Sequence, residues 1–291
     1  MKHSPRTPIL LLAALMILPG ASSLAKDSEG TLEKIARTGE FVIGYRTDSS
    51  PLSYENAEGQ PSGYSVDLCR RIAAGVKAHL GDKEFETKFV RVSSSERLSA
   101  VVDGKIDIEC GSTTITLSRQ EQVDFTLPTF VTGGGVLALA ASGIQSISDL
   151  SGKRVGVEKG TTTVEQLRNH LQENLIDAEV VVVDDREAGM VRLNRGGIDA
   201  FASDQIVLIG QVIEASNPKQ YYLVSEVFSY EPYGFAVRRN DADFRLVVNK
   251  AISHIYRNGH HADIYYKWIG RIGIKVPPIL AAMYQLSTIP E

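Results

Sequence analysis

The chain has 291 residues, 31 lysines and arginines against 35 aspartates and glutamates, and a formal net charge of −4. Nucleic-acid binding requires a basic face, so this mildly acidic composition argues against a nucleic-acid partner. A chain of this length forms one large domain or two modest ones.

The N-terminal segment has the pattern of an export signal. Lys2 and Arg6 precede the apolar run 9–18, which is too short to span a bilayer, and small residues follow at 23–25. We therefore expect cleavage after about Ala25, so that residues 1–25 are a signal peptide and the mature protein is periplasmic. The alternative of a membrane anchor is disfavoured by the length of the run.

Strand and helix patterns alternate along the rest of the chain. Strands are predicted at 41–45, 85–92, 106–110, 154–157, 179–183 and 198–201. Helices are predicted at 64–80, 95–103, 164–174, 186–195 and 205–215, with two more within 243–268. This order is typical of parallel sheets that carry helices on both faces.

Two breaks interrupt this order and suggest two chain crossings between two lobes. Residues 131–135 include three consecutive glycines, and residues 229–234 include a proline and a glycine. Strands are predicted directly after them, at 136–140 and 235–238. The glycines lack the Lys-Ser/Thr of a phosphate-binding loop, and the C-terminal histidines lack zinc-protease spacing, so we expect neither a cofactor nor a metal.

The two cysteines leave a choice open. Cys69 falls on the apolar face of the helix predicted at 64–80, and Cys110 ends the strand predicted at 106–110. An exported protein can join two such residues in a disulfide. Two buried free thiols, which behave as small hydrophobic side chains, fit the pattern as well.

The segment 110–119 brings hydroxyl groups and one guanidinium to the end of a strand. Ser112, Thr113 and Thr114 follow the strand, and Arg119 comes next. Such a set suits an amino acid, because hydroxyls accept from its ammonium and arginine binds its carboxylate through two parallel hydrogen bonds. The alternative is an ordinary turn with a solvated arginine.

The order of short motifs resembles that of the family-3 periplasmic solute-binding proteins of amino-acid ABC transporters, and most of all their glutamate/aspartate-binding branch. The matching motifs lie at 32–39, 42–46, 51–54, 63–67, 109–114, 119, 124–126, 149–155, 160–162, 197–201, 204, 233–237, 259 and 267–270. The resemblance implies an α/β fold of the type II periplasmic-binding-protein class. Each of its two lobes is a central sheet flanked by helices, and two crossing strands join the lobes, which close on the ligand. We expect lobe 1 in 26–133 plus 236–291 and lobe 2 in 134–235.

The resemblance also implies how the ligand's α-carboxylate is held. Arg119 matches the family's arginine for this group, with help from Thr114. Thr162 and Thr163, at the start of a helix in the other lobe, offer free backbone N–H groups to the same anion.

The α-ammonium is expected to meet Asp204 and Ser112. Asp204 matches the family's acidic residue for this group. Its alternative role is to cap the helix that begins at Gln205, which is the commoner use of such an aspartate.

A side-chain carboxylate of the ligand would meet three further residues. Arg46, Ser94 and Arg97 match the residues that hold this group in the glutamate/aspartate branch. Buried arginines need a carboxylate partner, which supports the match. The alternative is that Arg97 pairs at the surface with Glu96 or Glu58.

One position departs from that branch, which carries a histidine where this chain has Arg186. An arginine cannot accept a hydrogen bond from an ammonium and repels it. Either Arg186 turns outward and Asp185 or Glu187 faces the cleft, or the ligand is not quite glutamate.

These residues predict a monomeric protein that captures an acidic L-amino acid and delivers it to an inner-membrane ABC transporter permease, without catalysis. The main alternative is an enzyme on the same scaffold that resembles the cyclohexadienyl dehydratases. Their substrate prephenate has no amine for Asp204 to bind, although arogenate does. A detached sensory domain is a third class. The sequence does not separate glutamate from aspartate or a related acid.

Overall fold

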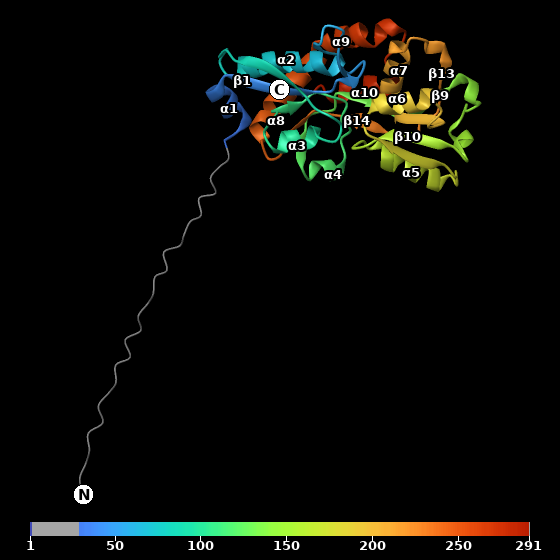
Figure 1. The fold of residues 1–291 in the computed structure, drawn as a ribbon. Coiled ribbons are helices and arrows are strands. Elements are labelled where there is room, and N and C mark those ends of the chain that lie inside the picture. Colours follow the sequence, from blue (N-terminus) through green and yellow to red (C-terminus); the bar gives the residue numbers. More distant parts are fainter. Residues whose placement is uncertain (2–28, 291) are drawn as a thin grey trace.

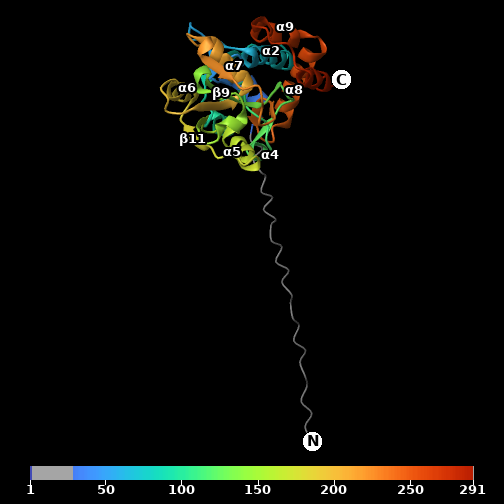
Figure 2. The ribbon, with the colours of Figure 1, turned by 90° about the vertical axis from the view of Figure 1, so that its right-hand side faces the viewer.

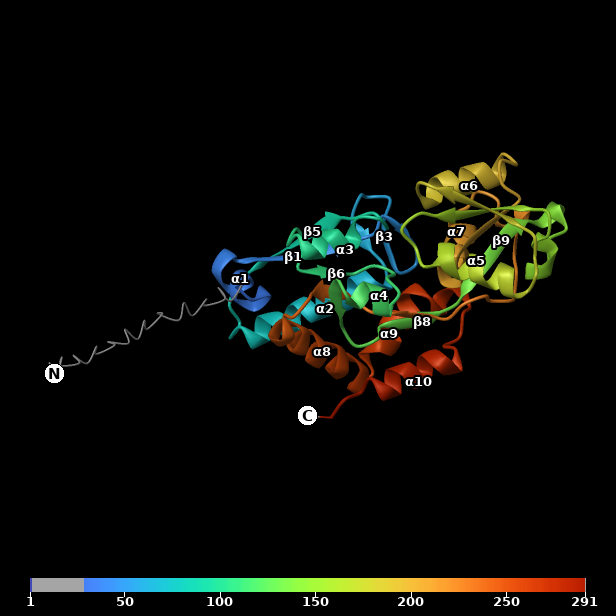
Figure 3. The ribbon, with the colours of Figure 1, turned by 90° about the horizontal axis from the view of Figure 1, so that it is seen from below.

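The computed structural model describes residue 1 and residues 29–290, so the predicted signal peptide lies outside the described part except for its first residue. Two lobes lie side by side, each built on a five-stranded sheet (Figures 1 and 3). None of the helices within the described residues is both long enough and apolar enough to cross a membrane.

The sheet of lobe 1 has the order β5-β1-β6-β15-β7. Its strands are β1 (Glu40–Tyr45), β5 (Glu86–Arg91), β6 (Ile108–Glu109), β7 (Val123–Phe125) and β15 (Ala236–Arg238). Strand β1 is parallel to β5 and β6, whereas β15 is antiparallel to both of its neighbours.

The sheet of lobe 2 has the order β11-β10-β12-β9-β13. Its strands are β9 (Gly134–Leu139), β10 (Arg154–Glu158), β11 (Glu179–Val183), β12 (Ala200–Asp204) and β13 (Tyr221–Leu223). Strand β9 alone runs against the others. The expectation of parallel sheets is therefore wrong for β9 and β15. Each of them directly follows a crossing strand, without the helical crossover that a parallel connection needs.

The two faces of each sheet are covered by different helices. In lobe 1, α2 (Tyr64–His79) and α8 (Ala242–Arg257) cover the face that contains Ile43, and α3 (Arg97–Val102) covers the opposite face. In lobe 2, α5 (Thr163–Glu173) packs on one face, and α6 (Arg186–Asn194) and α7 (Gln205–Glu214) pack on the other (Figure 2). Successive strand residues point to opposite faces, so buried strands supply both cores.

The lobes are joined by two antiparallel crossing strands, β8 (Phe130–Thr132) and β14 (Glu231–Tyr233). Strand β8 overlaps the break predicted at 131–135, and β14 lies within the break predicted at 229–234. The predicted C-terminal helix pair is α8 and α9 (His260–Trp268). A further helix, α10 (Pro278–Leu286), packs against β8 and was not predicted.

The remaining elements are short. They are α1 (Thr31–Thr38), α4 (Leu117–Gln120), the small sheet of β2 (Asp48–Ser49), β3 (Ser53–Glu55) and β4 (Pro61–Ser62), and 3-10 turns at Ala140–Ser142, Ile147–Leu150, Pro218–Gln220 and Gly270–Ile272. Two- and three-residue strands carry too little periodicity for prediction from sequence.

A disulfide joins Cys69 and Cys110, whose Cα atoms lie 6.4 Å apart. The two cysteines are therefore joined in a disulfide and are not free thiols. It ties α2 to the chain immediately after β6, two residues before Ser112.

Candidate functional site

The residues predicted to bind a ligand come from the carboxyl ends of the strands of both sheets. In lobe 1 they follow β1, β5 and β6, and in lobe 2 they follow β10 or end β12. Ligands of open α/β sheets bind outside the carboxyl ends of the strands, so this placement is the one expected of a binding site. The two sets meet where the lobes touch.

Three of these side chains in lobe 1 donate hydrogen bonds to one turn of lobe 2. The Ser94 hydroxyl donates to the carbonyl oxygen of Lys159 at 2.9 Å. The guanidiniums of Arg97 and Arg119 both donate to the carbonyl oxygen of Gly160, at 3.3 Å and 3.4 Å. The turn between β10 and α5 therefore lies against the cluster of lobe 1.

A buried carboxylate in a crossing strand joins two of the predicted threonines. Thr114 and Thr162 both donate to Oε2 of Glu231, at 2.6 Å and 2.9 Å, and their hydroxyl oxygens are 3.3 Å apart. Thr163 is the buried first residue of α5. Sequence reasoning missed Glu231, which lies in the break at 229–234 directly before Pro232.

Arg97 and Arg119 are two buried cations, and the charge of the buried Glu109 acts on both of them without contacting either. Within the described residues neither one forms a salt bridge with a carboxylate, and Nε of Arg97 has no hydrogen-bond partner. Burial, with repulsion from Arg119 and Arg46, lowers the pKa of Arg97 to about 9. Burial also lowers the pKa of Arg119. Two buried guanidiniums without a contacting carboxylate are suited to bind an anion.

The alternative of a surface ion pair for Arg97 is not realised. Its side chain is only 3% exposed, and the neighbouring Glu96 accepts a hydrogen bond from Ser93 instead.

Asp204 presents a carboxylate oxygen that has no protein partner. Tyr233 donates to Oδ2, whereas Oδ1 is buried and unpartnered within the described structure. The side chain makes no capping hydrogen bond to α7, so the capping alternative is wrong. Burial, followed by the nearby charge of Glu231, raises the pKa of Asp204 to about 7. The other residue predicted for the ammonium, Ser112, donates to the hydroxyl of Ser49 at 3.3 Å.

Arg46 lies in the same region but is already paired with acids of the protein. Its guanidinium contacts Asp48 at 2.8 Å and Glu158, from lobe 2, at 2.9 Å. Sequence reasoning missed both acids. Glu158 directly follows the predicted strand 154–157, and an acidic residue at the carboxyl end of a strand is the signal that could have revealed it.

Arg186 points inward, so the interpretation that it turns outward is wrong. It is 3% exposed and contacts Glu158 at 2.8 Å and Asp48 at 3.1 Å. Burial works against its charged form, but Glu158 and Asp48 raise the pKa of Arg186 above its ordinary value. Asp185 instead caps α6, accepting from the backbone of Ala188.

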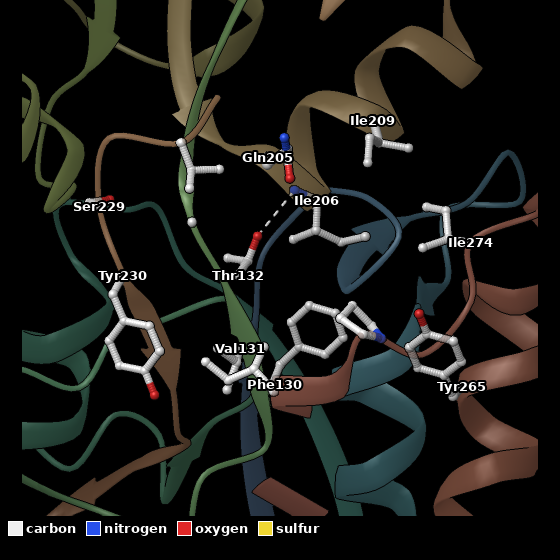
Figure 4. A pocket seen from close by; sticks show the side chains of 14 residues that line it. Phe130, Val131, Thr132, Gln205, Ile206, Ile209, Ser229, Tyr230, Tyr265 and Ile274 are labelled. Carbon is white, nitrogen blue, oxygen red and sulfur yellow. Dashed lines mark hydrogen bonds between the residues drawn. The ribbon is translucent and has the colours of Figure 1, made fainter. Parts of the chain in front are cut away.

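A separate apolar pocket of about 410 Å³ lies beside the crossing strands (Figure 4). Its lining includes Phe130, Ile206, Tyr265 and Ile274 and contains no charged side chain. An amino acid's ammonium and carboxylate require charged or strongly polar partners, so this pocket is distinct from the polar cleft described above.

Comparison with known proteins agrees with this architecture. Residues 41–271 match the bacterial extracellular solute-binding proteins, family 3. An L-glutamate/L-aspartate-binding protein of Pseudomonas aeruginosa is 35% identical over 93% of this chain and 89% of its own. A glutamate/aspartate import solute-binding protein of Escherichia coli is 31% identical over 91% of this chain and 88% of its own.

Among solved structures, an ancestral arginine-binding protein bound to arginine superposes with a TM-score of 0.71 at 29% identity, covering 79% of this chain and 98% of that one. The matched family and the named relatives are solute-binding proteins rather than enzymes, which favours a binding protein over the dehydratase alternative. The chain therefore belongs to the bacterial extracellular solute-binding proteins, family 3.

Proposed function

We propose that this protein captures an acidic L-amino acid, glutamate or aspartate, in the periplasm and delivers it to the permease of an ABC transporter. The observation that carries the proposal is the pair Arg97 and Arg119, two buried guanidiniums that contact no carboxylate of the described protein. Two such cations near the free oxygen of Asp204 match a molecule with two carboxylates and one ammonium.

Each group of the ligand has a proposed partner. Arg119 and the first turn of α5, with Thr114, Thr162 and Thr163, take the α-carboxylate. Asp204 and Ser112 take the ammonium, and Arg97 with Ser94 takes the side-chain carboxylate. The two relatives named for glutamate and aspartate support this choice of ligand.

The sharing of one ligand between the lobes supports delivery by lobe closure. Arg97, Arg119 and Ser94 come from lobe 1, whereas Thr162 and Asp204 come from lobe 2. A ligand that contacts both sets binds the closed form more tightly than the open form, and therefore shifts the population toward closure. The permease can then distinguish loaded from unloaded protein by shape.

Calorimetry on refolded, ligand-stripped protein tests the proposal. We expect glutamate or aspartate to bind with a Kd of about 1 μM or below, which corresponds to about −8 kcal/mol or stronger. Glutamine, arginine and leucine are the comparison ligands. If one of these three binds more tightly than both acids, the assignment of an acidic ligand is wrong.

A further inference from the structure

Four charged side chains form a closed ring across the cleft, and we call Arg46, Asp48, Glu158 and Arg186 the charge ring. Arg46 contacts Asp48 at 2.8 Å and Glu158 at 2.9 Å. Arg186 contacts Asp48 at 3.1 Å and Glu158 at 2.8 Å. Each lobe supplies one cation and one anion, so the ring is neutral and is complete only when the lobes meet.

Three members of the charge ring are almost fully buried. Arg46 and Glu158 are each 2% exposed and Arg186 is 3% exposed, whereas Asp48 is 26% exposed. Arg186 also donates to the backbone carbonyl of Asp48 at 2.8 Å and to the Ser49 hydroxyl at 3.2 Å. Removing one partner of a buried ion pair leaves an uncompensated charge at a high cost, so the ring resists giving up any single member.

We propose that Glu158 determines ligand specificity by neutralising Arg46. The inference rests on the proposed function and refines it. Arg46 is the arginine whose position suggests a role with the ligand's side-chain carboxylate, yet its Nη2 already donates to both Asp48 and Glu158. Arg97 and Arg119 contact no acid of the described residues, although the charge of Glu109 acts on both, so they are the arginines left to pair with ligand carboxylates.

Arg186 holds Glu158 in the position that this role requires. Oε1 of Glu158 accepts a hydrogen bond from Arg46, and Oε2 lies 2.8 Å from Nη2 of Arg186 in an ion pair that lacks hydrogen-bond geometry. With both oxygens engaged, the carboxylate cannot turn away from Arg46 without leaving Arg186 short of a partner. This pairing explains why an arginine can lie near an ammonium site. The charge of Arg186 pairs with Glu158 and Asp48 and not with the ligand.

We therefore expect the protein to prefer a ligand with a side-chain carboxylate over its amide analogue. This preference should be weaker than it would be if Arg46, Arg97 and Arg119 were all unpaired. A cation that is already paired within the protein gains little from a second anion. Removing the charge of Glu158 should therefore leave Arg46 with Asp48 as its one acid partner in the charge ring and strengthen binding of a ligand that carries a side-chain carboxylate. Binding of its amide analogue should change much less.

Glu158→Gln tests this directly. Affinities for glutamate and glutamine are measured by calorimetry, and we expect the ratio of the two to shift toward glutamate by at least about tenfold. Adding Arg46→Gln to the same protein should abolish that gain. The matched control is Asp184→Asn, which removes one negative charge from an exposed side chain bound to Lys159, and it should change the ratio less than about twofold.

An unchanged ratio in Glu158→Gln, a gain that persists without Arg46, or an equal gain in Asp184→Asn would each overturn the proposal. If Glu158→Gln does not fold, Glu158→Asp draws the carboxylate back from Arg46 and should shift the ratio in the same direction by a smaller factor. No shift there would also overturn it. Wild-type protein that binds glutamine but no acid would refute the proposed function, while a gain in Glu158→Gln would still support the role of Glu158.

Discussion

At the scale of single residues, two of the residues proposed to bind the ligand carry a buried atom without a partner. Nε of Arg97 and Oδ1 of Asp204 have no hydrogen-bond partner within the described structure. Leaving a buried polar group unpaired costs about 1–3 kcal/mol, and more when the group is charged. A ligand that supplies a carboxylate to the first and an ammonium to the second recovers this cost, so these two residues should contribute much of the binding energy.

Arg119 and Arg97, which form no salt bridge, should differ in the ligands whose binding they strengthen. Arg119→Gln is expected to weaken all amino-acid ligands by about 2–5 kcal/mol, because every such ligand carries an α-carboxylate. Arg97→Gln should weaken glutamate by a similar amount and glutamine much less. Calorimetry with both ligands measures this, with circular dichroism as the check on folding. Equal losses for glutamate and glutamine in Arg97→Gln would mean that this arginine supports the lobe rather than the ligand.

Binding should depend on pH through Asp204. Its pKa is raised to about 7 by burial and by Glu231, so the side chain carries a proton in the free protein below that pH. An ammonium needs the carboxylate form, so binding must release this proton. The affinity should fall as pH decreases from about 8 to about 6, by up to about tenfold for each pH unit below 7. Calorimetry in two buffers of different ionisation enthalpy measures the proton release.

A pH-independent affinity would contradict the role of Asp204.

The raised pKa of Asp204 also predicts how the stability of the free protein depends on pH, in the direction opposite to that of the affinity. Because the folded-state pKa lies above the ordinary value of 3.8, the folded protein holds an extra proton between these two values. This contribution to stability is therefore present at low pH and is lost as pH rises through about 7.

At the scale of elements, the turn between β10 and α5 shows why a glycine is needed between the lobes. Gly160 has φ 73°, and a Cβ at this position would lie 2.9 Å from Cα of Ser95 in lobe 1. Any larger residue would strain the backbone and push the lobes apart. The carbonyl of Gly160 accepts hydrogen bonds from Arg97 and Arg119. Both arginines reach this carbonyl because the turn lies close to lobe 1.

The disulfide should stabilise lobe 1 rather than create the site. Cys69 and Cys110 are 41 positions apart, and closing a loop of this size in the unfolded chain contributes about 2–4 kcal/mol to the free energy of unfolding. The double variant Cys69→Ser, Cys110→Ser should lose about this amount in urea titrations. Its ligand affinity should change less, because neither cysteine is among the residues proposed to bind the ligand. An unchanged urea midpoint would show that the bond adds no stability.

At the scale of the whole molecule, the lobes meet through both polar and apolar groups, because Ile206 and Val207 of α7 pack in the same buried cluster as Leu52 of lobe 1. The charge ring, the Gly160 carbonyl and the Thr114–Thr162 contact all cross the cleft. Polar contacts of this kind are comparable in strength with contacts to water, so they permit the lobes to separate. The continuous connections are the paired strands β8 and β14, which are only three residues each.

Ligand binding should therefore close the molecule about β8 and β14. Small-angle scattering is expected to show a smaller radius of gyration in saturating glutamate than in ligand-stripped protein. Arg119→Gln, which should not bind, serves as the control and should show no change on addition of glutamate. If wild-type protein binds glutamate without any change in radius of gyration, the site works without closure.

Much of the architecture could be predicted from local sequence because its causes are local. The alternation of apolar patterns predicted most strands and helices of both lobes but not the edge strands β7 and β13, and the glycines and proline at 131–135 and 229–234 marked the crossings. The direction of β9 and β15 could not be predicted, since strand direction depends on how the chain returns from the other lobe. Helix α10, which packs on β8, also went unpredicted.

The sequence by itself determined which chemical groups are available, because hydroxyls and arginines placed after strands are delivered to the same edge of a sheet. Only the tertiary structure decided which of them pair with each other. Glu158 accepts a hydrogen bond from Arg46, which is 112 positions away in the sequence, and Cys69 forms a disulfide with Cys110, which is 41 positions away. The inward turn of Arg186 depends on two acids, one of them in the other lobe. Such pairings follow from the packing of lobes, and no local pattern encodes them.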